Sequence, residues 1–390
     1  MAEFIAWWRR PRKAGGKRAR LLVGGDFCPA GRYEKKLLAG RPIFDPALSD
    51  VLHDKDLLLV NLETPLCRNV RSRFPTLRAS PSIASLLPEI GIDVVGLANN
   101  HIRDYGDSGV LQTIAALDRQ GVRHTGAGLD LPEAEKMLVV NVRGLAVGIW
   151  ARAEQEFNVA SESRAGSSWF RPELDALRIA ELRRRVDFLL VFVHAGNEFM
   201  LAPSPRIRSA YRGLVRAGAD VVIGHHPHVP QGIERFRGGW IFYSLGNLAF
   251  DSRYVSAYPD TDHGFLVDLE VRRHSVDSVH LRPYRLTERI LVEGMTRSQV
   301  HAYESFLRRL SGIITDDRRF ERTWQRNVRW RFLQDYMPQL KRLLRAYPRP
   351  AHSAAFRHLQ NYFRCPTHQE VLSAAFAMAE RRRERRGEGP

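Results

Sequence analysis

Short apolar segments rich in β-branched residues recur along the chain and end in Gly, Asp, Asn, Glu or His. They are too short to be helices, and several of them lack the polar alternation of a half-exposed strand. Uninterrupted apolar runs of this kind are typical of strands that are covered on both faces of a sheet. The clearest read RLLVGGD, DLLLVNLE, IDVVGLANN, MLVVNV, LAVGIW, DFLLVFVHAG, ADVVIGHH, WIFYSLGN and GFLVDLEV. The pattern therefore predicts a buried sheet structure that extends to about Leu286.

Helical patterns separate these strands. The segment DSGVLQTIAALDRQG ends at Gly121, and SPRIRSAYRGLVRAGA begins with Ser204 before Pro205, a pair typical of a helix start. The alternation of strand and helix predicts the α/β class. After Thr287 the strand pattern stops, and apolar residues at helical spacing predict a helical region at about 295–386.

The N-terminal segment, residues 1–19, combines Trp7 and Trp8 with a block of basic residues. We interpret it as an unstructured or surface-binding basic arm, and residues 1–20 could then contact a membrane interface. The apolar part of this segment is too short for a signal peptide, and no segment approaches the ~18 apolar residues of a membrane span. We therefore expect a cytoplasmic protein, with peripheral membrane contact as the alternative.

The net charge bears on the choice of partners, and the cysteines bear on disulfides and zinc sites. Across its 390 residues the chain has a formal net charge of +17. This charge favours a polyanionic partner, although an arginine-rich solvated surface explains it as well. The three cysteines, Cys28, Cys67 and Cys365, are far apart, which argues against a disulfide framework or a CxxC zinc site.

Side chains able to bind a metal directly follow several of the predicted strands. In open α/β sheets, ligands collect outside the carboxyl ends of strands. A single polar residue at such a place is usually a cap, but a series of them is hard to explain in that way. The series comprises Asp26, Glu63, Asn100 with the adjacent His101, His194, and the cluster His225, His226 and His228.

The ligand types in this series favour a transition metal. His226 and His228 are one residue apart, so an extended chain would point both to one face and His225 to the other. Imidazole, carboxylate and amide oxygen together suit Mn²⁺, Fe or Zn²⁺ rather than Ca²⁺. Two such cations bridged by a carboxylate would activate water for an in-line phosphoryl displacement.

Longer motifs carry a family resemblance. GGDFCPAGR, VNLETPL, GLANNHIRDYGDSGVLQT, GVRHTGAG, VFVHAGNEF, AGADVVIGHHPHVPQGIE and IFYSLGNLAFD occur in this order. At these residues the sequence resembles the bacterial capsule synthesis protein CapA, or poly-γ-glutamate synthesis, family, a branch of the calcineurin-like metallophosphoesterases. The resemblance implies a domain at 20–290 with two packed mixed β-sheets flanked by helices. The helical region after 295 lies outside the resemblance and forms a C-terminal extension.

The resemblance also implies roles for individual residues. His101 would be a histidine that does not bind metal but protonates the leaving group or holds a substrate oxygen. Asp104 would orient His101 or, more simply, cap the following helix. Glu63 would bridge two divalent transition metals (Mn, Fe or Zn). The full set of implied metal ligands is Asp26 and His228 for the first metal, Asn100, His194 and His226 for the second, and Glu63 for both.

Two positions depart from the family pattern. Cys28 stands where ordinary metallophosphoesterases have histidine, so it is either a thiolate ligand or a small buried apolar residue. The segment HAGNEF lacks the tryptophan that the family usually has after the histidine, and its Glu198 is expected near the metals or the substrate.

These observations predict a metal-dependent hydrolase that uses metal-activated water on a phosphoester or an anionic polymer. The alternative is a non-catalytic, metal-containing accessory protein of polyglutamate or capsule assembly, which would bind polymer carboxylates without turnover. The capsule or polyglutamate synthesis machinery is the expected partner in both. A nuclease ranks last, because only the positive charge favours a nucleic acid partner.

Overall fold

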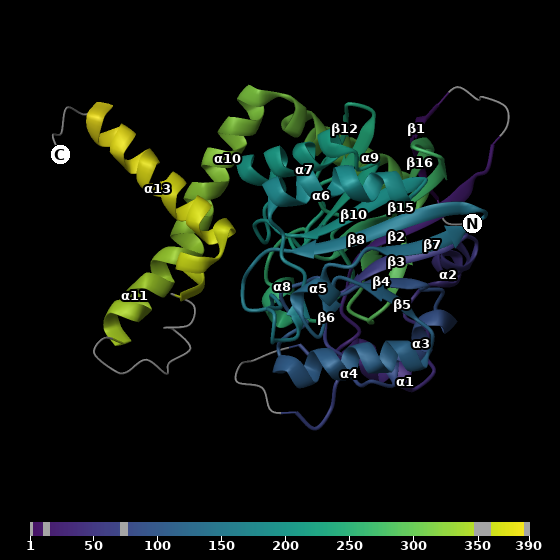
Figure 1. Ribbon diagram of the computed structural model, residues 1–390. Coiled ribbons are helices and arrows are strands. Elements are labelled where there is room, and N and C mark those ends of the chain that lie inside the picture. Colours follow the sequence, from purple (N-terminus) through teal and green to yellow (C-terminus); the bar gives the residue numbers. More distant parts are fainter. Residues whose placement is uncertain (1–2, 11–15, 71–76, 347–359, 386–390) are drawn as a thin grey trace.

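Two mixed β-sheets pack face to face, and helices cover the outer face of each sheet (Figure 1). A computed structural model describes residues 3–10, 16–70, 77–346 and 360–385. The predicted fold class is confirmed: the chain is α/β, with two packed mixed sheets flanked by helices and with a C-terminal helical extension.

The first sheet is parallel in one half and antiparallel in the other. Its strand order is β1-β16-β15-β2-β3-β4-β5, and β14 pairs with β2 while β17 pairs with β16. Strands β2 to β5 run parallel, and β15 joins the other edge of β2 in the antiparallel direction. The bounds are β1 (Ile5–Arg9), β2 (Ala19–Phe27), β3 (Leu57–Leu62), β4 (Val94–Gly96), β5 (Arg123–Thr125), β14 (Asn247–Ala249), β15 (His263–Arg272), β16 (Ser275–Leu286) and β17 (Val292–Gly294).

The second sheet has the order β12-β13-β11-β10-β8-β7. Its four central strands are parallel, and the two edge strands are antiparallel to them. A separate short ribbon pairs β6 with β9. The bounds are β6 (Ala127–Gly128), β7 (Leu138–Val142), β8 (Leu145–Ala153), β9 (Gly166–Ser167), β10 (Phe188–His194), β11 (Val221–His225), β12 (Ile233–Phe236) and β13 (Gly239–Phe242).

Three apolar layers hold the sandwich together. The central layer lies between the sheets and includes Val23, Leu59, Phe192 and Ile223. The other two lie under the flanking helices, with α1 to α4 on the first sheet and α6 and α7 on the second. Because both faces of each sheet are covered, every residue of β3, β10 and β11 is buried, as the uninterrupted apolar runs predict. The helix bounds are α1 (Arg32–Leu38), α2 (Pro46–His53), α3 (Ile83–Glu89), α4 (Gly106–Arg119), α5 (Leu131–Ala134), α6 (Pro172–Leu182), the 3₁₀ segment η1 (Arg183–Arg185), α7 (Pro205–Ala217) and α8 (Arg253–Ser256).

The N-terminal segment differs from its prediction. Residues 5–9 form β1, which pairs antiparallel with β16, so the expectation of an unstructured arm is wrong for them. Trp8 packs edge-on against Trp240, with their ring centroids 5.4 Å apart, and the Arg235 guanidinium lies over the Trp8 ring. Trp7 is likewise covered by Arg308. The two tryptophans thus contact the protein itself, while residues 1–2 and 11–15 lie outside the described part of the chain.

The C-terminal region is helical wherever it is described, as predicted. Its bounds are α9 (Arg297–Thr315), α10 (Asp317–Arg331), the π-helical segment η2 (Phe332–Tyr336), α11 (Met337–Ala346) and α13 (Pro366–Arg385). Figure 1 shows α11 and α13 projecting from the sandwich. Met200, which follows β10, packs against Trp324, Tyr336 and Tyr362 of this region and connects it to the second sheet. Within the described residues, no helix combines the length and apolar content needed to span a bilayer.

Candidate metal centre

The predicted metal-binding residues converge where strands of the two sheets end. Asp26 is near the end of β2, and Glu63 follows the last residue of β3. His194 is the last residue of β10, whereas Asn100 follows β4 and the two histidines follow β11. The structure therefore brings all six predicted residues into one cluster: Asp26, Glu63, Asn100, His194, His226 and His228.

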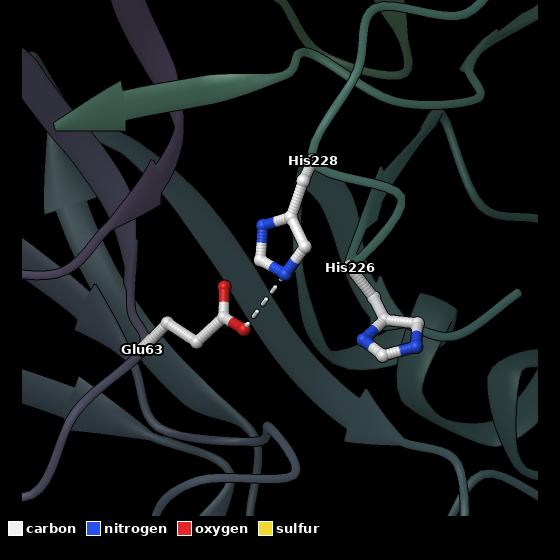
Figure 2. Close-up of side chains that lie close together, drawn as sticks. All are labelled: Glu63, His226 and His228. Carbon is white, nitrogen blue, oxygen red and sulfur yellow. Dashed lines mark ion pairs between the residues drawn. The ribbon is translucent and has the colours of Figure 1, made fainter. Parts of the chain in front are cut away.

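Glu63 lies at the centre of this cluster. Its Oε1 is 3.6 Å from Nε2 of His228 and 3.7 Å from Nε2 of His194. The dashed line in Figure 2 marks the pair with His228. Two groups of candidate ligand atoms share Glu63, and within each group the atoms lie within 4.8 Å of one another. One group contains Asp26 and His194, and the other contains His226 and His228. This sharing is the arrangement expected of a carboxylate between two cations.

The environment of Glu63 fits a bound cation. The side chain is fully buried, and neither carboxylate oxygen has a hydrogen-bond partner among the described residues. Burial, reinforced by Asp26, raises the pKa of Glu63 well above its usual range. A buried carboxylate without partners is costly, whereas a divalent cation beside it supplies the missing positive charge. The mixed oxygen and nitrogen donors suit Mn²⁺, Fe or Zn²⁺.

The pKa shifts of Asp26, His194 and His226 favour the protonation states that metal binding requires. Burial, together with the neighbouring His226, lowers the pKa of His194 well below its usual value. Burial also lowers the pKa of His226. For Asp26, burial opposes ionisation, but His225, His194 and His228 outweigh it and lower the pKa. Neutral imidazoles and an ionised carboxylate are the forms that ligate metals.

The backbone at the histidine cluster is not extended. Strand β11 ends at His225, and the next residues turn back with φ of +92° at His226 and +59° at His228. Residues other than glycine adopt this left-handed region at some cost, and such residues concentrate at functional sites. The two rings therefore reach the same cluster through a strained turn rather than through strand alternation.

His225 was predicted to point away from the cluster, and this prediction is wrong. Its Nδ1 lies 3.1 Å from Oδ1 of Asp26, and its ring packs against Phe192. Because the chain leaves the strand at this residue, alternation does not separate His225 from its neighbours. Instead, His225 holds the carboxylate of a candidate ligand in place.

We expect His225→Phe to weaken metal binding by roughly 10- to 100-fold, the usual effect of removing a group that orients a ligand. His225→Asn is the matched control, because its amide nitrogen can take the place of Nδ1 beside Asp26. Metal titration of the metal-free protein measures both affinities. Equal affinities for His225→Phe and the wild type would show that this contact is dispensable.

Two asparagines also hold the ligands, and neither was predicted from the sequence. Asn61 donates to Oδ1 of Asp26 at 2.8 Å and lies 3.2 Å from Nδ1 of His194. Asn247 Oδ1 is 2.9 Å from Nδ1 of His228. Each is a buried polar residue that follows a mostly apolar run, in LLLVN and WIFYSLGN. That local conflict was the signal that could have found them.

His101 and Asp104 form a pair at the more open side of the cluster. His101 Nδ1 lies 2.9 Å from Asp104 Oδ2, and its Nε2 is 4.0 Å from Glu63 Oε1. Burial opposes protonation of His101, but Asp104 outweighs it and raises the pKa of His101.

The simpler expectation that Asp104 caps the following helix is wrong, since α4 begins after Tyr105 and has no side-chain cap.

The two positions that depart from the family pattern lie in different environments: Cys28 in an apolar layer and Glu198 in a network of polar contacts. Cys28 is buried in the apolar layer beneath the first sheet, and burial raises the pKa of its thiol. Among the described residues, no group of candidate ligand atoms includes it. Glu198 accepts hydrogen bonds from Arg331 at 3.1 Å and from the Tyr254 hydroxyl at 3.3 Å. Burial opposes its ionisation, yet Arg331 and the nearby histidines lower the pKa of Glu198 to about 2.

Comparison with known proteins gives matches to a sequence family, to individual relatives and to solved structures. Residues 20–252 match the family described as bacterial capsule synthesis protein PGA_cap. The chain is 29% identical over 282 residues to the capsule biosynthesis protein CapA of Bacillus anthracis, covering 69% of this chain and 67% of that protein. It is 28% identical over 273 residues to the PGA biosynthesis protein CapA of Bacillus subtilis (strain 168), covering 68% and 70%. A 5′-nucleotidase precursor from Thermus thermophilus aligns with a TM-score of 0.39 and 15% identity, covering 74% of this chain and 58% of that one.

Proposed function

Because the chain belongs to the bacterial capsule synthesis protein (PGA_cap) family, we propose that it is a metal-dependent hydrolase of capsule or poly-γ-glutamate synthesis. Its substrate would be a phosphoester or an anionic polymer. The observation that carries the proposal is the Glu63 carboxylate, which is buried without a hydrogen-bond partner among the described residues and faces the imidazoles of His194 and His228.

Six residues would hold two divalent transition metals around Glu63. When bound, the two cations would activate water and stabilise the charge that develops on the displaced oxygen. The imidazoles and carboxylates are already held by neighbours such as Asn61, His225 and Asn247, so little reorganisation is needed. The proposed ligands are Asp26, Glu63, Asn100, His194, His226 and His228.

His101 would donate a proton to the leaving oxygen. Its side chain is 27% exposed, whereas that of Glu63 is fully buried, so His101 stands between the cluster and solvent. Asp104 fixes the imidazole through Nδ1 and stabilises its protonated form. The other ring nitrogen, Nε2, then presents the proton on the side of Glu63.

The substrate class follows from charge and from the relatives. The two CapA relatives are named for capsule and PGA biosynthesis, and the net charge of +17 suits a polymer that carries many carboxylates. The synthesis machinery of such a polymer would be the partner. The cytoplasmic location stays a prediction. Trp7 and Trp8, the residues that suggested membrane contact through residues 1–20, pack against the protein instead.

The second candidate is an accessory protein whose metal centre binds polymer carboxylates or stabilises the fold without turnover. The near-complete burial of Glu63, His194 and His228 favours it, because little of the centre is reachable by a bulky polymer.

Metal analysis of the purified chain, combined with turnover of an aryl phosphate and of poly-γ-glutamate, separates the two. A hydrolase should contain two metals at this centre and turn over at least one of the substrates. A metal-loaded protein that binds the polymer and leaves both substrates intact would establish the accessory function instead.

A further inference from the structure

A second cluster of metal-binding side chains lies beside the candidate centre, in Glu156, Cys365 and His368. One potential ligand atom from each residue lies within 4.8 Å of those of the other two. Glu156 comes from the loop after β8, whereas Cys365 and His368 come from the start of α13, beyond the residues that match the family. We propose that this cluster is a third divalent-cation site, which fastens the C-terminal extension to the sandwich.

The start of α13 presents two of these residues together. Cys365 immediately precedes the helix, and His368 is three residues further on, so the two side chains lie on neighbouring positions of the first turn. The carbonyl of Cys365 accepts from the amide of Gln369, and its amide donates to the carbonyl of Asn361. This backbone geometry fixes the direction in which both side chains leave the helix.

Polar contacts hold the same turn against the sandwich. The Thr367 hydroxyl donates to Oε2 of Glu154 at 2.6 Å, and Arg206 of α7 pairs with both Glu154 and Glu370. Glu154 is two residues before Glu156, so these contacts also fix the loop that supplies the third ligand. The three side chains of the cluster are therefore supplied by segments that polar contacts fix in place, as a specific metal site requires.

The donor set selects a class of cation. A thiolate, an imidazole and a carboxylate suit Zn²⁺ or another cation of similar softness, and not Mg²⁺ or Ca²⁺. The Tyr336 hydroxyl lies 2.6 Å from Nδ1 of His368, the kind of oxygen contact that orients a metal-binding imidazole. Three protein ligands leave one tetrahedral position for water.

To bind a cation, the three ligand atoms of this site would have to move only slightly closer together. Bond lengths of roughly 2.0–2.3 Å place the ligand atoms of a tetrahedral zinc site about 3.3–3.8 Å apart. The atoms here lie within 4.8 Å, so rotamer adjustments of the three side chains are enough to close the site. Cys365 is already 1% exposed, which shields its sulfur from solvent.

The proposed site adjoins the first centre but shares no ligand with it. Glu156 Oε1 lies 3.8 Å from Nε2 of His226, and Oε2 accepts a hydrogen bond from Asn100 at 3.3 Å. Glu156 thus connects the two clusters. A cation held by Glu156 would keep this carboxylate from competing for His226, so the extension would influence the first centre through one side chain.

Cobalt substitution of the full-length protein tests the proposal without relying on activity. Co²⁺ bound by a thiolate gives a sulfur-to-metal charge-transfer band in the near ultraviolet. We expect this band in the wild type, and we expect Cys365→Ser to lose it completely. Cys67→Ser and Cys28→Ser are matched controls that should keep it, and Glu63→Gln should keep it as well because the first centre contributes no thiol.

A second variant guards against misfolding. His368→Asn leaves the thiol in place and should lower the affinity for Co²⁺, read from the same band, by at least about tenfold. Absence of the band in the metal-loaded wild type, its survival in Cys365→Ser, or its loss in Cys28→Ser would each overturn the proposal. These outcomes are separate from the proposed hydrolase, which can fail in a turnover assay while the band remains.

Discussion

Glu63→Gln is expected to abolish metal-dependent turnover, by at least about a hundredfold, and to remove metal from the first centre. A loss of this size is typical when a preorganised charge at a reaction centre is deleted. Glutamine keeps the shape of the side chain but cannot supply the negative charge that the two proposed cations would share. Elemental analysis and turnover of an aryl phosphate measure the two effects, and Glu89→Gln, an exposed position on α3, is the control.

The same substitution should change the stability of the metal-free protein in a predictable direction. Folding raises the pKa of Glu63, so the folded state binds its proton more tightly than the unfolded state does. The free energy of unfolding should therefore fall as the pH rises above the usual glutamate pKa of about 4.3. Glu63→Gln should remove this part of the pH dependence in chemical denaturation. An unchanged metal content and an unchanged pH dependence would together place Glu63 outside any metal centre.

His101→Ala is expected to lower turnover by about 10²–10⁴ while leaving the metal content unchanged. His101 reaches toward Glu63 from the more open side of the cluster and is held by Asp104, a geometry suited to proton donation. Steady-state kinetics and elemental analysis on the same preparation separate proton transfer from metal retention. His301→Ala, on the exposed face of α9, is the control and should match the wild type.

Asp104→Asn should give a smaller loss, because the imidazole stays in place but its protonated form is less stable. Loss of metal in His101→Ala would make His101 a ligand. Wild-type turnover in the same variant would make it a structural residue that shapes the loop.

The buried strands could be predicted because their environment leaves a direct mark on the sequence. In β3 and β10 both faces are covered, so nearly every residue is apolar and the polar residue that ends the run stands out. Glu63 and His194 were found in this way. By contrast, β16 was not among the predicted strands, since Asp277, His280 and Arg282 interrupt its apolar pattern.

The rest of the site depends on tertiary contacts that have no local signature. The predicted direction of His225 was wrong because β11 ends at this residue. The left-handed backbone that follows cannot be recognised from the residue types. β1 was missed for a related reason, because its tryptophans are covered by arginines that lie far away in the sequence. Cys365 and His368 form a cluster with Glu156 only because α13 packs beside that residue, and the sequence does not show this contact.

The pairing of β2 with β15 sets a constraint on how the chain can be made. Val23 of β2 lies opposite Val267 of β15. The first strand of the parallel half is therefore completed by one of the last strands of the sandwich. On the ribosome, β2 to β4 can assemble early, but the edge of β2 opposite β3 stays open until β14 and β15 have emerged. A nascent chain of 252 residues, where the family match ends, would lack β15 and would leave residues 19–23 of β2 unpaired on this side. The topology therefore leaves this edge of β2 unpaired until late in synthesis, a period in which an open strand edge can pair with other chains.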